Sequence, residues 1–236
     1  MIEVSRVSAG YGGQDVLKDL SFSLPQGENL AILGPNGCGK TTLLRVIAGL
    51  LPCRGDVRVD GRSIARMKPR ELAAHIGLMS QNMQIPFDYT VEDVVRMGRY
   101  RMRRRGLFEA ENREDGQAVR DALETVGLWE LRNRTANTLS GGQQQRVFLA
   151  RVFAQQPEIV MLDEPTNHLD LSSQIELMQQ LRLYGSQPNR QVIGVFHDLT
   201  LAPMLGGQAI FMREGQILRQ GAFSDIASPS FLRQVY

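Results

Sequence analysis

Residues 34–41 read Gly34-Pro35-Asn36-Gly37-Cys38-Gly39-Lys40-Thr41, and they match the pattern G-x-x-x-x-G-K-[ST] at every fixed position. The glycines let successive backbone N–H groups turn inward around an anion. In this pattern the lysine reaches the β- and γ-phosphates, and the hydroxyl of Thr41 is placed to bind Mg²⁺. The segment therefore predicts a site for a nucleoside triphosphate.

The flanking sequence has the order that such a phosphate loop requires. Residues 29–33 read as a short buried strand, and residues 42–48 carry apolar side chains at helical spacing directly after the loop. The N-terminus of that helix adds free N–H groups and partial positive charge to the phosphate site. We therefore include Thr42, at its start, among the nucleotide-binding residues.

Composition sets broad limits on the rest of the chain. With 236 residues it can bury a large apolar core, and a net charge of +2 gives no global field that would attract nucleic acid, so we expect no nucleic-acid partner. The two cysteines, Cys38 and Cys53, show no metal-ligand spacing and fit a reducing compartment. No signal-peptide pattern and no apolar run of about 18 residues occurs, so we expect a soluble, unsecreted chain.

Periodicity along the chain predicts an α/β fold. Residues 2–7 and 20–24 alternate apolar with polar, and 56–61 read as a strand ending in an Asp-Gly turn, which together indicate an N-terminal antiparallel β-subdomain. Residues 90–138 are helical in pattern. Continuous apolar runs at 159–162 and 192–196 are typical of parallel strands buried on both faces, with a helix between them striped by Leu171, Ile175, Met178 and Leu181.

Two acids follow the apolar run at 159–162. Asp163 is placed at the carboxyl end of the predicted strand, where it would hold Mg²⁺ opposite Thr41, and Glu164 comes next and could polarise an attacking water. An acid after an apolar run is in general an ordinary exposed strand end. The presence of the phosphate loop makes the metal-binding interpretation the stronger one.

A second anion site is predicted about a hundred residues after the first. Leu139-Ser140-Gly141-Gly142-Gln143 precedes a helix over 144–154, so Ser140 and the two glycines offer a hydroxyl and backbone N–H groups at a helix N-terminus. With this motif the sequence resembles an ABC-type ATP-binding cassette over essentially its full length. The resemblance implies a single ABC ATPase domain over 1–236. Its P-loop NTPase core would have a mainly parallel sheet, with a helical subdomain inserted at about 85–155.

The resemblance implies further roles, residue by residue. Tyr11 matches the aromatic residue that stacks on adenine, Gln81 the glutamine that links the catalytic site to the transmembrane partner, Asp170 the acid of the D-loop, and His197 the histidine that contacts the γ-phosphate. In such a cassette Ser140, Gly141, Gly142 and Gln143 close over ATP held by another copy, in a head-to-tail dimer. Taken singly, Tyr11, Gln81 and His197 would read as ordinary surface, loop and strand-end residues.

The predicted mechanism is hydrolysis of ATP with Mg²⁺. Lys40 and the loop amides would hold the phosphates, Thr41 and Asp163 with Gln81 would surround Mg²⁺, Glu164 would be the general base, and His197 would orient the γ-phosphate. ATP would favour the closed dimer, and hydrolysis would release it.

Three classes of function were weighed for this site. The main one is the energy-coupling subunit of a membrane transporter, which implies permease subunits, indirectly a substrate-binding protein, and a place on the cytoplasmic face of the inner (plasma) membrane. Soluble ABC ATPases acting on nucleic acid or ribosomes are the second, but the chain has one cassette and no sustained heptads. GTP switch proteins, the third class, are disfavoured by the motif at 139–143.

Two short segments, 86–100 and 163–170, resemble the importer cassettes for iron-siderophore, haem and vitamin B12. Manganese/zinc importer cassettes share similar segments and remain the alternative. A basic cluster within residues 96–105 either is a solvated helix end and loop or faces the permease beside anionic headgroups. Its members are Arg96, Arg99, Arg101, Arg103, Arg104 and Arg105.

Overall fold

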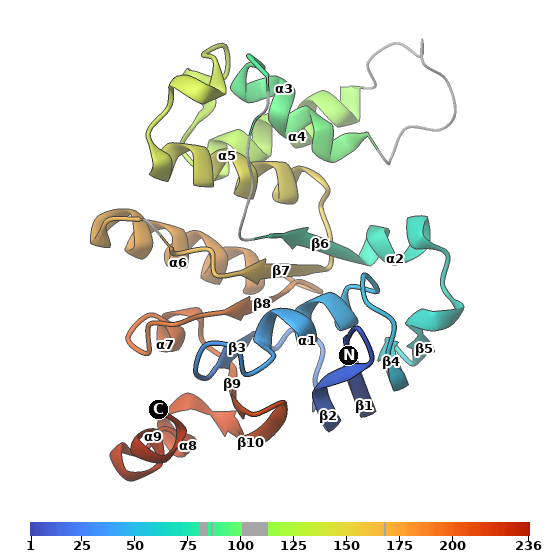
Figure 1. Cartoon of the computed structure of the whole chain (residues 1–236). Helices are drawn as coiled ribbons and strands as arrows, with labels where there is room; N and C mark the ends of the chain where they lie inside the picture. Colours follow the sequence, from blue (N-terminus) through green and yellow to red (C-terminus); the bar gives the residue numbers. More distant parts are fainter. Residues whose placement is uncertain (81–84, 86, 101–112, 168) are drawn as a thin grey trace.

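The computed structural model describes residues 1–80, 85, 87–100, 113–167 and 169–236, which form two β-sheets and the helices around them (Figure 1). In chain order the elements, with η for 3₁₀ helices, are β1 (Ile2–Tyr11), β2 (Gln14–Leu24), β3 (Leu30–Leu33), α1 (Lys40–Ile47), β4 (Arg54–Val59), β5 (Arg62–Ser63), η1 (Ile64–Arg66), α2 (Pro69–His75), β6 (Ile76–Met79), α3 (Val91–Arg96), η2 (Met97–Arg99), α4 (Arg113–Thr125), η3 (Trp129–Leu131), η4 (Ala136–Thr138), α5 (Gly141–Ala154), β7 (Ile159–Asp163), α6 (Leu171–Gly185), β8 (Gln191–Val195), α7 (Ala202–Leu205), β9 (Gln208–Arg213), β10 (Gln216–Ala222), α8 (Phe223–Ile226) and α9 (Pro229–Val235).

The N-terminal sheet is antiparallel, with strand order β2-β1-β4-β5, as predicted. β1 and β2 are longer than the alternation indicated, because their pairing continues through register shifts to Tyr11 opposite Gln14. Gly12 and Gly13 turn the chain there, with φ of 58° and 84° that glycine adopts at little cost. The hairpin therefore carries Tyr11 and Val16 close to each other in the fold.

The second sheet forms the centre of the molecule, with strand order β10-β9-β3-β8-β7-β6. Its strands are parallel except for β10, which pairs antiparallel with β9. β3 is buried along its whole length, and its alternate residues enter two cores. Leu30 and Ile32 pack with α1 and the N-terminal sheet, whereas Ala31 and Leu33 pack with α5, α6 and α7.

Three predicted helices differ from the structure in detail. α5 begins at Gly141 rather than at residue 144, so both glycines of the motif at 139–143 belong to its first turn. α1 begins at Lys40 rather than at residue 42, so the end of the phosphate loop is itself helical. In α6, Met178 and Leu181 are fully buried as expected, but Leu171 is 67% exposed. Leu171 is the first residue of that helix and follows the exposed N-cap Asp170. The first residue of the predicted apolar face therefore lies outside the core.

Helices α3, α4 and α5 pack together and lie above the β6 edge of the central sheet in Figure 1. α3 begins with a capping box between Thr90 and Asp93, and α5 begins with another between Ser140 and Gln143. The limits of 85–155 for a helical subdomain within one domain stay a prediction. Across the described ranges, no helix combines the length and apolar character that crossing a bilayer would need.

Candidate functional site

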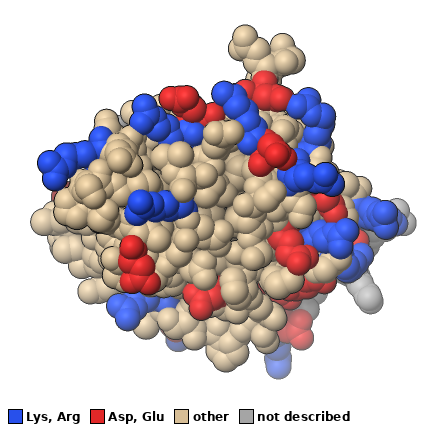
Figure 2. All heavy atoms as spheres, turned by 90° about the horizontal axis from the view of Figure 1, so that it is seen from below, with Lys and Arg blue, Asp and Glu red and all other residues tan. Residues whose placement is uncertain are grey.

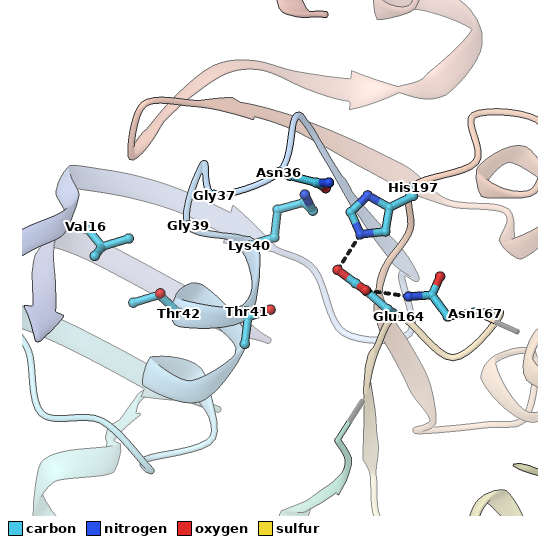
Figure 3. Close-up of a pocket in the computed structure, with 10 residues that line it drawn as sticks. All are labelled: Val16, Asn36, Gly37, Gly39, Lys40, Thr41, Thr42, Glu164, Asn167 and His197. Atoms are coloured by element: carbon cyan, nitrogen blue, oxygen red, sulfur yellow. Dashed lines mark hydrogen bonds and ion pairs between the residues drawn. The ribbon is translucent and has the colours of Figure 1, made fainter. Parts of the chain in front are cut away.

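A cleft of about 680 Å³ lies where β3, β7 and β8 reach their carboxyl ends (Figure 3). Its lining residues are Val16, Asn36, Gly37, Gly39, Lys40, Thr41, Thr42, Glu164, Asn167 and His197. The carboxyl edge of a parallel sheet is where α/β proteins generally bind ligands, because loops from several strands converge there. Five predicted phosphate-loop residues, Asn36, Gly37, Gly39, Lys40 and Thr41, therefore line one cleft with Glu164 and His197.

The loop at 34–41 has the geometry of a phosphate cradle. A Cβ on Gly34 would lie 2.2 Å from the backbone oxygen of Met212, so only glycine fits there. Gly39 is the N-cap of α1 with φ of 108°, and no described side chain caps the helix. The first N–H groups of α1 are therefore left for an anion, which fits a bound phosphate chain.

Lys40 and Thr41 project from the first turn of α1. The Lys40 ammonium is buried and donates to the backbone oxygens of Gly34 at 2.8 Å and Pro35 at 2.9 Å, so it lies folded along the loop. Thr41 Oγ1 donates to Asp163 Oδ1 at 2.8 Å. A hydroxyl and a carboxylate oxygen are thus brought together from positions 122 residues apart in sequence, and both are ligands that Mg²⁺ accepts.

Asp163 ends β7 and is buried at 7% exposure. Burial raises the pKa of its carboxyl above the ordinary value, and the hydrogen bond from Thr41 opposes that shift. Among the described residues no group of three His, Cys, Asp or Glu side chains is arranged to hold a metal. A Mg²⁺ site of the phosphate-loop type uses one carboxylate, one hydroxyl and the phosphates themselves, so Asp163 and Thr41 are the residues that could hold the ion.

Glu164 has a left-handed backbone, with φ of 55°. Such a conformation is unfavourable for a residue with a Cβ, and it clusters at functional sites. The turn directs the carboxylate away from β7 and into the cleft, where it contacts His197 Nε2 through Oε1 and Asn167 Nδ2 through Oε2 (Figure 3). The structure therefore brings the predicted base and the predicted γ-phosphate histidine into direct contact.

Other predicted nucleotide-binding residues lie around the cleft rather than in it. Cys38 is buried behind the loop, and burial raises the pKa of its thiol. Tyr11 is 47% exposed at the β1–β2 turn, and its hydroxyl accepts a hydrogen bond from Arg45 at 3.1 Å. Its predicted stacking on adenine stays a prediction.

The motif at 139–143 lies apart from this cleft. Ser140, Gly141, Gly142 and Gln143 are not among its lining residues, and Ser140 is exposed at the N-cap of α5. A Cβ on Gly142 would lie 3.0 Å from Ser173 Oγ, so the motif adjoins the start of α6. Asp170 caps that same helix by accepting from the Ser173 N–H at 2.9 Å, and these hydrogen bonds lower the pKa of its carboxyl. The two motifs predicted to bind anions therefore lie in different places on one copy, and anion binding at 139–143 stays a prediction.

The remaining predictions fall partly outside the described residues. Gln81 lies outside them, as do Arg101, Arg103, Arg104 and Arg105 of the basic cluster. The other two arginines are paired with acids: Arg96 with Glu92, and the buried Arg99 with Asp115 at 2.7 Å. Arg99 therefore cannot belong to an exposed basic surface, because its side chain is buried against Asp115.

Two residues of the cleft were not predicted, Val16 and Asn167. Val16 comes from β2 and reaches the cleft because the N-terminal sheet packs beside α1. Asn167 is three residues after Glu164, a spacing at which a side chain can turn back on the preceding loop. The short spacing from Glu164 could have indicated Asn167 as a cleft residue. The residues next to Val16 in sequence give no such indication.

A strand, glycine loop and helix joined to a carboxylate at the end of a parallel strand define a P-loop nucleotide-binding protein. The family model described as ABC transporter matches residues 17–167. The chain belongs to this family. It is therefore an ATP-binding cassette and an ATPase.

Similar proteins cover most of the chain. The ferric enterobactin transport ATP-binding protein FepC of Escherichia coli (strain K12) is 39% identical over 98% of this chain and 85% of its own length. The hemin import ATP-binding protein HmuV of Rhodopseudomonas palustris (strain HaA2) is 35% identical over 100% of this chain and 90% of its own length. The dimeric structure of a post-hydrolysis state of the ATP-binding cassette MJ0796 bound to ADP and Pi matches with a TM-score of 0.79 and 28% identity, over 94% of this chain and 98% of that one.

Proposed function

We propose that this chain is the ATP-hydrolysing subunit of a membrane importer for an iron chelate, either a ferric siderophore or haem. The convergence of Thr41 with Asp163, and of Glu164 with His197, in one cleft supports hydrolysis of ATP. The likeness to the ferric enterobactin and hemin proteins supports the cargo class. Vitamin B12 and manganese or zinc remain alternative cargoes, and a soluble ABC ATPase acting on nucleic acid or ribosomes remains the alternative class.

The mechanism follows from where the side chains lie. When ATP binds, the Lys40 ammonium gives up its hydrogen bonds to the backbone oxygens of Gly34 and Pro35 and binds the β- and γ-phosphates. The N–H groups at the start of α1 bind the same phosphates. Thr41 and Asp163, with Gln81 as predicted from sequence, would hold Mg²⁺, and the ion would neutralise negative charge on the phosphates. Glu164 accepts the proton of the attacking water, and His197 orients the γ-phosphate.

The site is completed by a second copy of the chain in this proposal. Ser140, Gly141, Gly142, Gln143 and Asp170 lie outside the cleft, and Ser140 and Asp170 are exposed, which fits residues that act on nucleotide held by a partner. The dimeric structure of the MJ0796 cassette supports pairing of two copies, and the head-to-tail arrangement is part of this proposal. Tyr11 stacks on adenine, as the β1–β2 turn beside Val16 allows.

Permease subunits and, indirectly, a substrate-binding protein are the other proposed partners. They would hold the chain at the cytoplasmic face of the inner membrane. On the face shown in Figure 2, which lies away from helices α3, α4 and α5, acidic and basic side chains are interspersed. A surface of mixed charge gives no single-sign field to steer an oppositely charged partner.

The proposal is tested by growth on a ferric chelate as the only iron source. Deleting the gene should abolish this growth, the wild-type gene on a plasmid should restore it, and Glu164→Gln should fail to restore it, because hydrolysis is needed to reset the transporter. Growth with soluble ferrous iron is the control and should be unaffected. Undiminished growth of the deletion strain on ferric siderophores and on haem would overturn the cargo class.

A further inference from the structure

We infer that Asn167 is a positioning residue for Glu164, holding the carboxylate in the orientation in which it accepts a proton from water. This inference rests on the proposed role of Glu164 as the general base. It concerns a residue that does not itself act on ATP.

The Glu164 carboxylate is held from two sides. Asn167 Nδ2 donates to Oε2 at 2.6 Å, and His197 Nε2 lies against Oε1, so each oxygen has its own partner from a different segment (Figure 3). The Glu164 side chain is only 12% exposed, which makes such contacts stronger than in open solvent. The last side-chain torsion of Glu164 has a broad, shallow energy profile, and rotation about it moves both oxygens, so contacts on both oxygens restrain it more tightly than His197 alone.

The backbone of the loop is fixed without the Asn167 side chain. Gln145 of α5 donates to the backbone oxygen of Pro165 at 2.8 Å. Gln174 of α6 donates to the backbone oxygens of Thr166 and Leu169, each at 3.2 Å. Asn167 N–H also donates to the Glu164 backbone oxygen at 3.3 Å. These bonds place the Asn167 amide, so its side chain is presented to Glu164 already oriented.

An amide suits this position chemically. It donates a hydrogen bond to a carboxylate without adding a charge, so it orients the base with less loss of basicity than an arginine or lysine would cause. A carboxylate has about four acceptor positions, so the bonds from Asn167 and His197 are compatible with accepting a proton as well. Misplacing a catalytic group by about 1 Å can reduce the rate on the order of a hundredfold. Asn167 therefore acts on kcat rather than on ATP affinity.

The test measures steady-state ATPase and equilibrium ATP binding on full-length variants. Asn167→Ala should lower kcat on the order of tenfold to a hundredfold, with KM and the ATP Kd within about twofold. Asn167→Asp, of the same shape but without the donor, should lose at least as much, since two carboxylates would then face each other. Gln174→Ala is the matched control: it removes a loop hydrogen bond but keeps the Asn167 donor, and kcat should stay within about threefold.

A double variant separates positioning from a general structural effect. Glu164→Gln with Asn167→Ala should turn over no more slowly than Glu164→Gln alone, because the group that Asn167 positions is already gone. The inference is overturned by a further drop in the double variant, by a wild-type kcat for Asn167→Ala or Asn167→Asp, or by Gln174→Ala matching Asn167→Ala. Wild-type turnover by Glu164→Gln would instead overturn the proposed base itself.

Discussion

Replacing Asp115 by alanine should strongly destabilise the helical part of the protein. Asp115 of α4 accepts from Arg99 Nε at 2.7 Å, and both side chains are 9% exposed. Arg99 also donates to the backbone oxygen of Ala154, at the end of α5, at 3.0 Å. The pair thus ties η2, α4 and α5 together. Removing only the acid leaves a guanidinium charge buried without its counter-ion.

The size of the effect follows from these contacts. Removing one partner of a buried ion pair lowers the free energy of unfolding by about 3–5 kcal/mol. Because Arg99 keeps its hydrogen bond to the backbone oxygen of Ala154, we expect a loss of about 3 kcal/mol, the lower end of that range. Urea denaturation followed by far-UV circular dichroism measures the change. With a slope of about 3 kcal/mol/M for a chain of this size, the midpoint should fall by about 1 M.

Two further variants make the reasoning refutable. Arg99→Met with Asp115→Leu replaces the pair by apolar groups and should recover most of the midpoint, because neither charge is then buried alone. Glu124→Ala breaks the exposed pair with Arg120 on the same helix and should leave the midpoint unchanged, since such surface pairs are screened by water. A shift below about 0.2 M for Asp115→Ala, or a double variant no better than the single one, would show the reasoning to be wrong.

Two other predictions concern the nucleotide site. Glu164→Gln should bind ATP normally and accumulate as a dimer in size-exclusion chromatography with ATP and Mg²⁺; a variant that is monomeric under all conditions would contradict the head-to-tail arrangement. Gly215→Ala should cost about 2–3 kcal/mol and weaken ATP binding, because its backbone joins Cys38 to Lys18 and an added Cβ would lie 2.0 Å from the Val16 oxygen at φ of 82°. Thermal melts measure the change in stability, and Gly116→Ala, in open space on α4, is the control that should be neutral or stabilising in them.

The Arg96–Arg105 cluster illustrates a limit of prediction from sequence. Its arginines lie together in sequence, yet Arg99 pairs with an acid sixteen residues away and is buried. Sequence distance says little about contact once helices pack side by side, because residues 3–4 apart on a helix and residues on a neighbouring helix are equally close. An exposed basic surface therefore cannot be inferred from composition alone.

Local sequence is enough to predict the phosphate loop and the turn between β4 and β5. Each depends on residues that are neighbours in the chain: the glycines and Lys40 of the loop, and Asp60-Gly61 of the turn. Such features can be predicted from the spacing of residues, because the atoms that interact belong to residues close together in the sequence.

Only the tertiary structure decided which of these local features form one site. The strand order places β8 between β3 and β7, which brings Thr41 to Asp163 and Glu164 to His197, and the packing of the N-terminal sheet brings in Val16. Strands β3, β7 and β8 have similar apolar sequences, so the order in which they pair cannot be predicted from any one of them. It follows from long-range pairing and burial, which are properties of the whole chain.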